Sequence, residues 1–378
     1  MSPRTIFIDT AEQLREMRLE IARENVLAID TEFHSEKRYF PELMLVQIAT
    51  AKGDVWIVDP KAVSMKALGE ALRSALLITH GGQQDIRILH QDLQLRPAKL
   101  FDTQIAAGFL GYRYPMGLQA LCERIIQVEV SKGETLTDWS KRPLDPDQVR
   151  YAADDARLLF PLYTELLQQI QNRDTPELQL EASMWEACHE MVEQQIVPPA
   201  VGLSWIHWGI AENLDINGQR ILTNLLEWRE ETASRKNQAP NYIMSRSILI
   251  YLAKTQPKSL DAIQNRRIHP TFIKRHGKTV IKVIKNALQD TDEFLLPTPE
   301  QKERAEVLKM WVNIFSKEVN IAPTLLLPKD ILEGITLHGV SILQGWRRTL
   351  ILNRLKQFLR GKESILMKEG KPVLTPIN

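Results

Sequence analysis

The chain has 378 residues, of which 44% are hydrophobic and 25% are charged, as is typical of folded globular proteins. This length exceeds one ordinary core and favours two or three domains. No apolar run reaches the roughly 18 residues that span a bilayer, and the first residues lack a signal-peptide pattern. We therefore expect a cytoplasmic protein without a membrane partner.

The net charge of +1 conceals an uneven distribution. Residues 1–175 hold 21 Lys and Arg against 25 Asp and Glu, a net charge of −4, and the remaining residues hold 27 against 22, a net charge of +5. A basic surface attracts polyanions, so the second half is favoured as a nucleic-acid contact. Ordinary solvated helix faces would explain the same asymmetry.

Short apolar runs and helical periodicity alternate through the first 100 residues, and we expect a mixed sheet flanked by helices. Strands are predicted at 5–8, 26–33, 43–50, 55–58 and 77–79, and helices at 10–22, 65–76 and 84–93. The turn at 52–54 predicts a hairpin between two of these strands. Beyond residue 104 the pattern is almost entirely helical.

The second half contains a weak internal repeat. Leu225–Trp228 is followed by Gln238–Pro240, and Val307–Trp311 is followed by Ile321–Pro323 at a similar distance, which gives a period of roughly 83 residues. Proline-rich sequence marks a boundary near 295–299.

Two carboxylates stand at the end of the apolar run Val26–Ile29. Alternate side chains of a strand share a face, so Asp30 and Glu32 point the same way and Thr31 points away. Adjacent anions repel unless one is protonated or a cation lies between them. A strand that ends in a solvated turn is the alternative interpretation.

Two further acidic positions lie on predicted helices. Asp85 falls in the first turn of the helix after Gly81-Gly82, where it would also favour the helix dipole. Tyr151 and Asp155 are four residues apart and share a helix face. Each pattern alone also fits a purely structural role.

Together these residues predict a two-metal phosphodiesterase site. Four carboxylates can hold two Mg²⁺ or Mn²⁺ ions about 4 Å apart, which stabilise the attacking and leaving oxygens. Oxygen ligands suit either metal. A tyrosine hydroxyl beside them could orient the attacking water.

The order Asp-x-Glu, Asp and Tyr-x-x-x-Asp resembles the DEDDy class of 3′–5′ exonucleases, and ribonuclease D in particular. Three more stretches carry the resemblance: Arg38–Leu43, Phe101–Gln104 and Asp138–Leu144. The resemblance implies a ribonuclease H-like α/β domain over residues 1–175. It also implies that Asp30, Glu32, Asp85 and Asp155 are the metal ligands and that Tyr151 positions the water. Thr31 and Phe33 occupy places that line the 3′-terminal nucleotide in such enzymes, and His34 is close enough to join them.

Residues 201–290 contain 14 Lys and Arg against 7 Asp and Glu. Leu226–Glu230 with Asn237–Pro240 resembles the all-α HRDC domain, which implies RNA contacts such as Arg229 and Lys236. We expect a linker at 176–209, a first HRDC domain at 210–294 and a second, diverged HRDC-like domain at 300–378.

These features lead us to expect a metal-dependent 3′–5′ exoribonuclease. From the resemblance it would trim tRNA precursors or other structured RNA 3′ ends and release nucleoside 5′-monophosphates, without an obligate protein partner. A 3′–5′ DNA exonuclease of the same class is one alternative, since the sequence does not display contacts to the 2′-hydroxyl. A catalytically silent nucleic-acid-binding scaffold is the other.

Overall fold

The computed structural model describes the chain in two compact units, each of which is considered by itself. The described residues are 3–129, 138–197, 213–263, 268–291 and 296–377. The first unit comprises residues 1–33, 43–197 and 297–378, and the second comprises 34–42 and 198–296. No helix within the described ranges is both long enough and apolar enough to cross a membrane.

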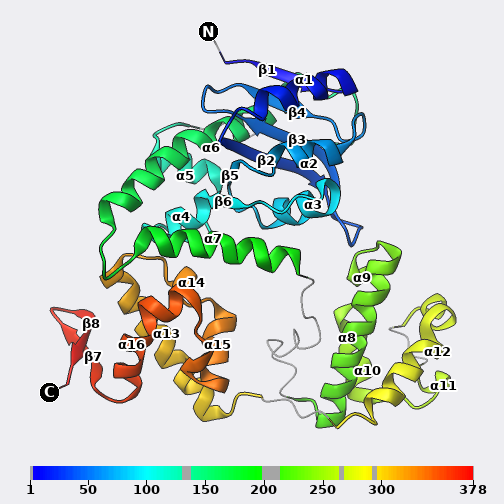
Figure 1. The fold of residues 1–378 in the computed structure, drawn as a ribbon. Helices are drawn as coiled ribbons and strands as arrows, with labels where there is room; N and C mark the ends of the chain where they lie inside the picture. The colour runs from blue at the N-terminus through cyan, green and yellow to red at the C-terminus, as the bar shows by residue number, and fades with distance from the viewer. Residues whose placement is uncertain (1–2, 130–137, 198–212, 264–267, 292–295, 378) are drawn as a thin grey trace. The chain divides into compact units, whose positions relative to one another are not determined.

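The first unit begins with an α/β domain in which helices flank one sheet (Figure 1). Its strands are β1 (Thr5–Ile8), β2 (Val26–His34), β3 (Glu42–Ala49), β4 (Val55–Val58), β5 (Leu76–Thr79) and β6 (Lys99–Asp102). Its helices are α1 (Ala11–Ile21), α2 (Met65–Leu72), α3 (Gln83–Leu93), α4 (Thr103–Phe109), α5 (Leu118–Ile125), α6 (Pro146–Arg173) and α7 (Leu180–Ile196).

The sheet is mixed, with the strand order β1-β4-β3-β2-β5-β6. Strands β2, β5 and β6 run parallel, and β3 and β4 form the predicted antiparallel hairpin. Parallel strands place their carboxyl ends at one edge of a sheet, where α/β proteins build their ligand sites. The segments that follow β2, β5 and β6 therefore emerge together.

Local sequence explains why the helices begin where they do. Thr10 and Gln13 form a capping box at the start of α1, and Asp145 and Gln148 form another at the start of α6, where Pro146 occupies the first turn. Each box satisfies amide groups that otherwise lack partners inside the helix. The α6 box fixes the start of the helix that carries Tyr151 and Asp155.

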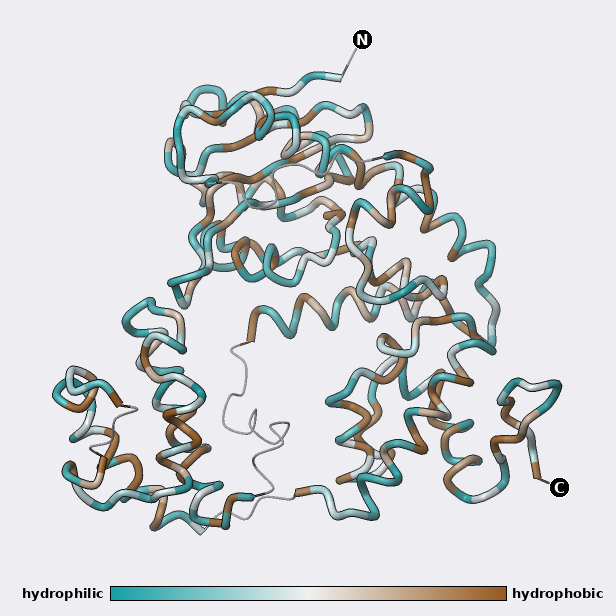
Figure 2. The backbone as a smooth tube through the Cα atoms, turned by 180° about the vertical axis from the view of Figure 1, so that it is seen from behind, coloured by the Kyte–Doolittle hydropathy of each residue, from teal (hydrophilic) through white to brown (hydrophobic). Residues whose placement is uncertain are grey.

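Helix α7 completes the core of the first unit. It packs on β6, α3 and α4, and its side chains Leu180, Met184 and Cys188 are fully buried. The segment 176–209 was expected to be a linker, but α7 is an integral layer of the α/β domain. Figure 2 shows how hydrophobic and hydrophilic residues alternate along the helices of this unit, as amphipathic helices require.

The C-terminal part of the chain shares the hydrophobic core of the first unit. Its elements are α13 (Pro299–Val319), α14 (Pro323–Leu326), α15 (Lys329–His338), η3 (Val340–Ile342), α16 (Gly345–Leu359), β7 (Glu363–Lys368) and β8 (Lys371–Pro376). Ala322 N donates to Gly108 O at 2.8 Å, and the rings of Phe109 and Trp346 lie 4.8 Å apart. These contacts fasten α14 and α16 to α4.

The second unit is helical and has its own core, built around Leu222, Leu226 and Leu252. Its helices are α8 (Ile216–Lys236), α9 (Pro240–Ile243), α10 (Arg246–Thr255), α11 (Leu260–Ile263) and α12 (Pro270–Ala287). The segment 34–42 belongs to this unit, because Ala239 N donates to Lys37 O at 3.1 Å.

The predicted internal repeat is confirmed by the helices themselves. Helices α8 and α13 are both 21 residues long, each ends at an asparagine in the left-handed conformation, and each is followed by a four-residue helix that begins at proline. Helices α10 and α15, of 10 residues each, come next. Every one of these elements recurs at about the predicted period of 83 residues.

Two elements were not predicted. Strand β6 has only four residues, and no secondary structure was predicted for them. The second repeat was expected to be all helical, but it ends in the antiparallel hairpin β7–β8. The expected boundaries after residues 209 and 294 fall outside the described residues.

Candidate active site

Strand β2 presents the first two carboxylates. Leu27, Ala28 and Ile29 are fully buried, which fixes the register of the strand because a slip by one residue would expose them. Asp30 and Glu32 follow at the carboxyl end of the strand and are half-buried. The predicted placement of this pair on a strand is confirmed.

Asp85 lies in the first turn of α3, as predicted, and is 9% exposed. The hydroxyl of Thr31 donates to Asp85 Oδ1 at 2.5 Å. A buried carboxylate needs such donors, because burial without hydrogen bonds is costly. The Thr31 hydroxyl thus orients the carboxylate of Asp85, and the expected contact of Thr31 with a nucleotide stays a prediction.

The fourth carboxylate comes from the long helix α6. Tyr151 and Asp155 share one face of this helix, and the Tyr151 hydroxyl donates to the Asp155 carboxylate. The ring of Trp139 lies 6.3 Å from the ring of Tyr151 and is almost completely buried. The tyrosine is therefore held between an aromatic contact and a hydrogen bond.

Electrostatic coupling shows that the four carboxylates lie within range of one another. The pKa of Asp30 is raised well above its ordinary value, mainly by burial and to a smaller extent by the charges of Asp85, Glu32 and Asp155. Burial, then Asp155 and Asp85, raise the pKa of Glu32 to about 8. Such mutual destabilisation of anions is characteristic of sites that do chemistry rather than of structural carboxylates.

The pKa values of the other two carboxylates, Asp85 and Asp155, are raised less, because each of these groups accepts a side-chain hydrogen bond. Burial raises the pKa of Asp85 to about 6, although the hydrogen bond from Thr31 lowers it. Burial likewise raises the pKa of Asp155 to about 6, although the hydrogen bond from Tyr151 lowers it. Hydrogen bonds to the charged form of an acid favour that form. Thr31 and Tyr151 thus keep two of the four groups closer to ionisation at neutral pH.

An all-carboxylate donor set fits a divalent cation with a preference for oxygen ligands. Within the described ranges, no three His, Cys, Asp or Glu side chains already converge in a metal-coordinating arrangement. The assignment of a metal site therefore rests on the carboxylate donors and on their electrostatic interactions, and not on a preformed coordination shell.

Arg142 anchors the segment that carries Trp139. Its guanidinium donates to the Asp59 carboxylate, to Trp139 O at 2.9 Å and to Met44 O at 3.0 Å. Burial opposes ionisation of Asp59, yet the bonds from Arg142 lower the pKa of Asp59 below its ordinary value. Sequence patterns gave the stretch but not this role, because the partners lie on β3 and β4.

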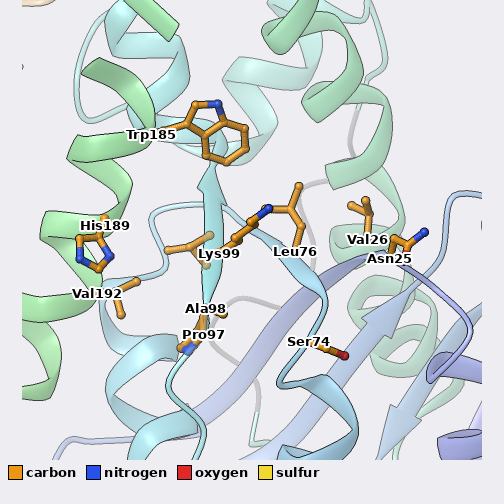
Figure 3. Close-up of a pocket in the computed structure, with 11 residues that line it drawn as sticks. Asn25, Val26, Ser74, Leu76, Pro97, Ala98, Lys99, Trp185, His189 and Val192 are labelled. Carbon is orange, nitrogen blue, oxygen red and sulfur yellow. The ribbon is translucent and has the colours of Figure 1, made fainter. Parts of the chain in front are cut away.

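A cavity of about 860 Å³ lies elsewhere in the first unit (Figure 3). It is lined by Val26, Leu76 and Lys99, which are at the starts of β2, β5 and β6, and by Trp185 and His189 on α7. Asp30, Glu32 and Asp85 lie toward or beyond the opposite ends of β2 and β5. The cavity is therefore separate from the carboxylate site.

The two basic residues predicted to contact RNA differ in exposure. Lys236 is exposed at the end of α8. Arg229 is only 8% exposed, and its guanidinium is bonded to Met244 O and paired with Glu230 at 3.3 Å. Burial argues against an RNA contact at Arg229. Phe33 packs on the core of the first unit, and His34 is the last residue of β2.

Comparison with known proteins identifies the family of the chain. Residues 5–171 match a family model described as a 3′–5′ exonuclease, and residues 218–284 match the HRDC domain model. Ribonuclease D of Pseudomonas paraeruginosa is 30% identical over 360 residues, which cover 89% of this chain and 92% of that protein. Ribonuclease D of Xanthomonas oryzae pv. oryzae is also 30% identical, over 92% of this chain and 96% of that protein.

The fold has a solved counterpart. The crystal structure of Escherichia coli RNase D, described as an exoribonuclease involved in structured RNA processing, has a TM-score of 0.81 at 24% identity. The comparison covers 96% of this chain and 99% of that chain.

The two matched models define the class of the protein as a 3′–5′ exonuclease whose sequence continues into an HRDC domain. An identity of 30% over about nine-tenths of the chain narrows this class to one family. The chain belongs to the ribonuclease D family and is a 3′–5′ exoribonuclease, and the E. coli structure has the same fold. The predicted family, fold class and enzyme class are therefore confirmed.

Proposed function

We propose that this exoribonuclease trims the 3′ ends of tRNA precursors or other structured RNAs and releases nucleoside 5′-monophosphates. The observation that carries the proposal is the group of four carboxylates beside Tyr151, in which the charges of Asp85 and Asp155 raise the pKa of Asp30 and of Glu32. Hydrolysis of a phosphodiester by two cations requires such a concentration of anionic oxygen ligands.

In this proposal Asp30, Glu32, Asp85 and Asp155 hold two divalent ions, either Mg²⁺ or Mn²⁺. Bound cations would acidify the attacking water and neutralise the charge on the departing 3′ oxygen. The hydroxyl of Tyr151, already directed at Asp155, orients the water toward the terminal phosphorus. Thr31 keeps the Asp85 carboxylate turned toward the site.

The body of the RNA would bind along α12 in the second unit. Lys274, Lys278, Lys282 and Lys285 recur at spacings of three or four residues, are all exposed and share one helix face. In the described part of the chain none of them forms an ion pair. Helix α12 contains no Asp or Glu, so its positive charge is available to phosphates.

Two arginines of the second repeat are engaged by carboxylates of the first unit. Arg347 pairs with Glu190 at 2.7 Å, and Arg354 pairs with Glu318 at 3.2 Å and also bonds Glu363. We therefore assign RNA contact to the first repeat, with Lys236 as an additional contact in place of Arg229. Phe33 and His34 remain proposed contacts for the terminal nucleotide.

The test is digestion of a 5′-labelled tRNA precursor with a short 3′ extension, in Mg²⁺, in Mn²⁺ and in EDTA. We expect a ladder that shortens from the 3′ end, is abolished by EDTA and disappears in Asp155→Asn. The neighbouring substitution Asp154→Asn is the matched control, because Asp154 is paired with Arg157 at 2.6 Å and should cleave like wild type.

Metal-dependent cleavage that survives in Asp155→Asn would refute the ligand assignment. RNA binding without cleavage under all conditions would favour the scaffold alternative, and faster digestion of a matched DNA strand would favour the DNA exonuclease. The cytoplasmic location, the absence of an obligate protein partner and the limits 210–294 of the first HRDC domain remain parts of the proposal.

A further inference from the structure

Asp102 is a buried carboxylate for which the proposed mechanism has no role. It ends β6, has 0% exposure and precedes Thr103, which is also completely buried. Taking an ionised carboxylate out of water is costly unless hydrogen bonds replace its hydration. Its position must therefore be stabilised by several donors.

Four hydrogen bonds converge on this side chain. Oδ1 accepts from the backbone N–H groups of Gln104 and Ile105, both at 2.9 Å, and so caps α4. Oδ2 accepts from the backbone N–H of Gly82 at 2.9 Å and from the hydroxyl of Thr79 at 3.1 Å. One carboxylate thus joins the end of β5, the start of α3 and the start of α4.

The contact with α3 is tight. Gly82 is the residue that precedes α3, and a Cβ atom added to it would lie 2.6 Å from Thr79 Oγ1. The preceding Gly81 has a φ of +59°, in the left-handed region that favours glycine. The turn into α3 is therefore fixed by its own conformation on one side and by Asp102 on the other.

Asp85 lies three residues after Gly82, in the first turn of the same helix. Its side chain is oriented from β2 by Thr31, and its backbone is located by the turn that Asp102 holds. Residues that orient metal ligands through hydrogen bonds commonly affect metal affinity by 10- to 100-fold.

We propose that Asp102 is a positioning residue for the divalent-ion site, because its buried carboxylate holds the start of α3 and thereby places the Asp85 carboxylate. The proposal rests on the function proposed above, in which Asp85 is a metal ligand. Asp102 itself touches neither ion nor RNA in this scheme.

The substitution Asp102→Asn distinguishes the hydrogen bonds that Asp102 makes to α4 from those that it makes to Thr79 and α3. With its oxygen toward α4, the amide continues to accept from Gln104 and Ile105, and asparagine is an efficient helix cap. Its NH₂ group then faces Thr79, whose hydroxyl can accept, and Gly82, whose N–H cannot. The bond to α3 is lost, while the cap of α4 is kept.

The first readout is binding of Mn²⁺ to the full chain by calorimetry, which requires no turnover. We expect the Mn²⁺ dissociation constant to rise about 10-fold in Asp102→Asn and by a smaller factor in Thr79→Val, which removes one donor and retains Gly82. Asp215→Asn, which replaces the capping aspartate of α8 in the second unit, is the matched control and should bind as wild type does.

The second readout is the exonuclease rate as a function of Mn²⁺ concentration. A positioning role shifts the half-saturating concentration and restores most of the rate at high Mn²⁺, whereas partial misfolding lowers the rate at every concentration. Unchanged Mn²⁺ binding in folded Asp102→Asn would overturn the inference. If that protein does not fold, unchanged binding in Thr79→Val would overturn it instead.

Asp85→Asn distinguishes failure of this inference from failure of the proposed function. If Asp85→Asn loses Mn²⁺ affinity and Asp102→Asn does not, only the positioning role falls. If Asp85→Asn binds Mn²⁺ as wild type does, the ligand assignment falls, and the role of Asp102 falls with it.

Discussion

Replacing Glu32 by glutamine should stabilise the metal-free protein while it abolishes activity. Glu32 is held beside Asp155 and Asp85 in a partly buried position, and its pKa is raised from 4.5 to about 8. Glutamine has nearly the same shape and carries no charge. The substitution therefore removes the repulsion and also removes a proposed ligand.

The effect must depend on pH, and its sign follows from proton binding. Below pH 4.5 Glu32 is protonated in both the folded and the unfolded chain, so its raised pKa costs nothing. Between pH 4.5 and 8 the unfolded chain releases this proton and the folded chain retains it, so the stability of the fold falls as pH rises. The full difference corresponds to roughly 5 kcal/mol, and solvent screening of the half-exposed side chain reduces it to on the order of 3 kcal/mol.

The assay is scanning calorimetry of wild type and Glu32→Gln in EDTA at pH 5 and pH 8.5. At pH 5 we expect similar melting temperatures, and at pH 8.5 we expect Glu32→Gln to melt roughly 5 to 10 °C higher. Glu16→Gln, at an exposed position of α1, should show no such difference. An equal gap between Glu32→Gln and wild type at both pH values would refute the electrostatic reasoning.

Three further predictions concern binding and turnover. Tyr151→Phe should lower the single-turnover rate about 100-fold with little change in RNA affinity, because the attacking water loses its orientation. Tyr163→Phe on the same helix is the control, and equal rates for Tyr151→Phe and wild type would contradict the role of the hydroxyl. Lys278→Gln with Lys282→Gln should weaken RNA binding and reduce the slope of log affinity against log salt by about 1.5, as measured by fluorescence anisotropy, whereas Lys317→Gln with Lys329→Gln should leave the slope unchanged. Affinity for Mn²⁺ should rise as the pH increases through about 6 and about 8, because groups with these pKa values must lose their protons before they can bind. Calorimetry that shows a pH-independent affinity would exclude these carboxylates as ligands.

Local signals in the sequence predicted most of the α/β domain and the four carboxylates. The apolar run before Asp30 specifies a buried strand, and the four-residue spacing of Tyr151 and Asp155 specifies a shared helix face, so both could be placed without coordinates. Strand β6 was missed because only Leu100 and Phe101 of its four residues are apolar, with Lys99 and Asp102 at its ends, which is too short an apolar run to identify a strand.

Long-range contacts account for what the sequence did not reveal. Arg229 has the pattern of a basic surface residue, and only the packing of α8 on its neighbours buries it. Asp102 receives bonds from Thr79 and Gly82, which lie about 20 residues away on other elements. The sequence signal available was an aspartate directly before a helical stretch, which predicts a helix cap and nothing more.

The first unit is discontinuous along the chain, and this has a consequence for its synthesis. Residues up to 197 leave the ribosome well before α16, and at 5 to 20 residues per second the interval is roughly 10 to 30 s. During that time the apolar surface of α4, including Phe109, has no Trp346 to cover it. The exonuclease domain therefore stays incomplete and prone to aggregation until the last quarter of the chain has been synthesised.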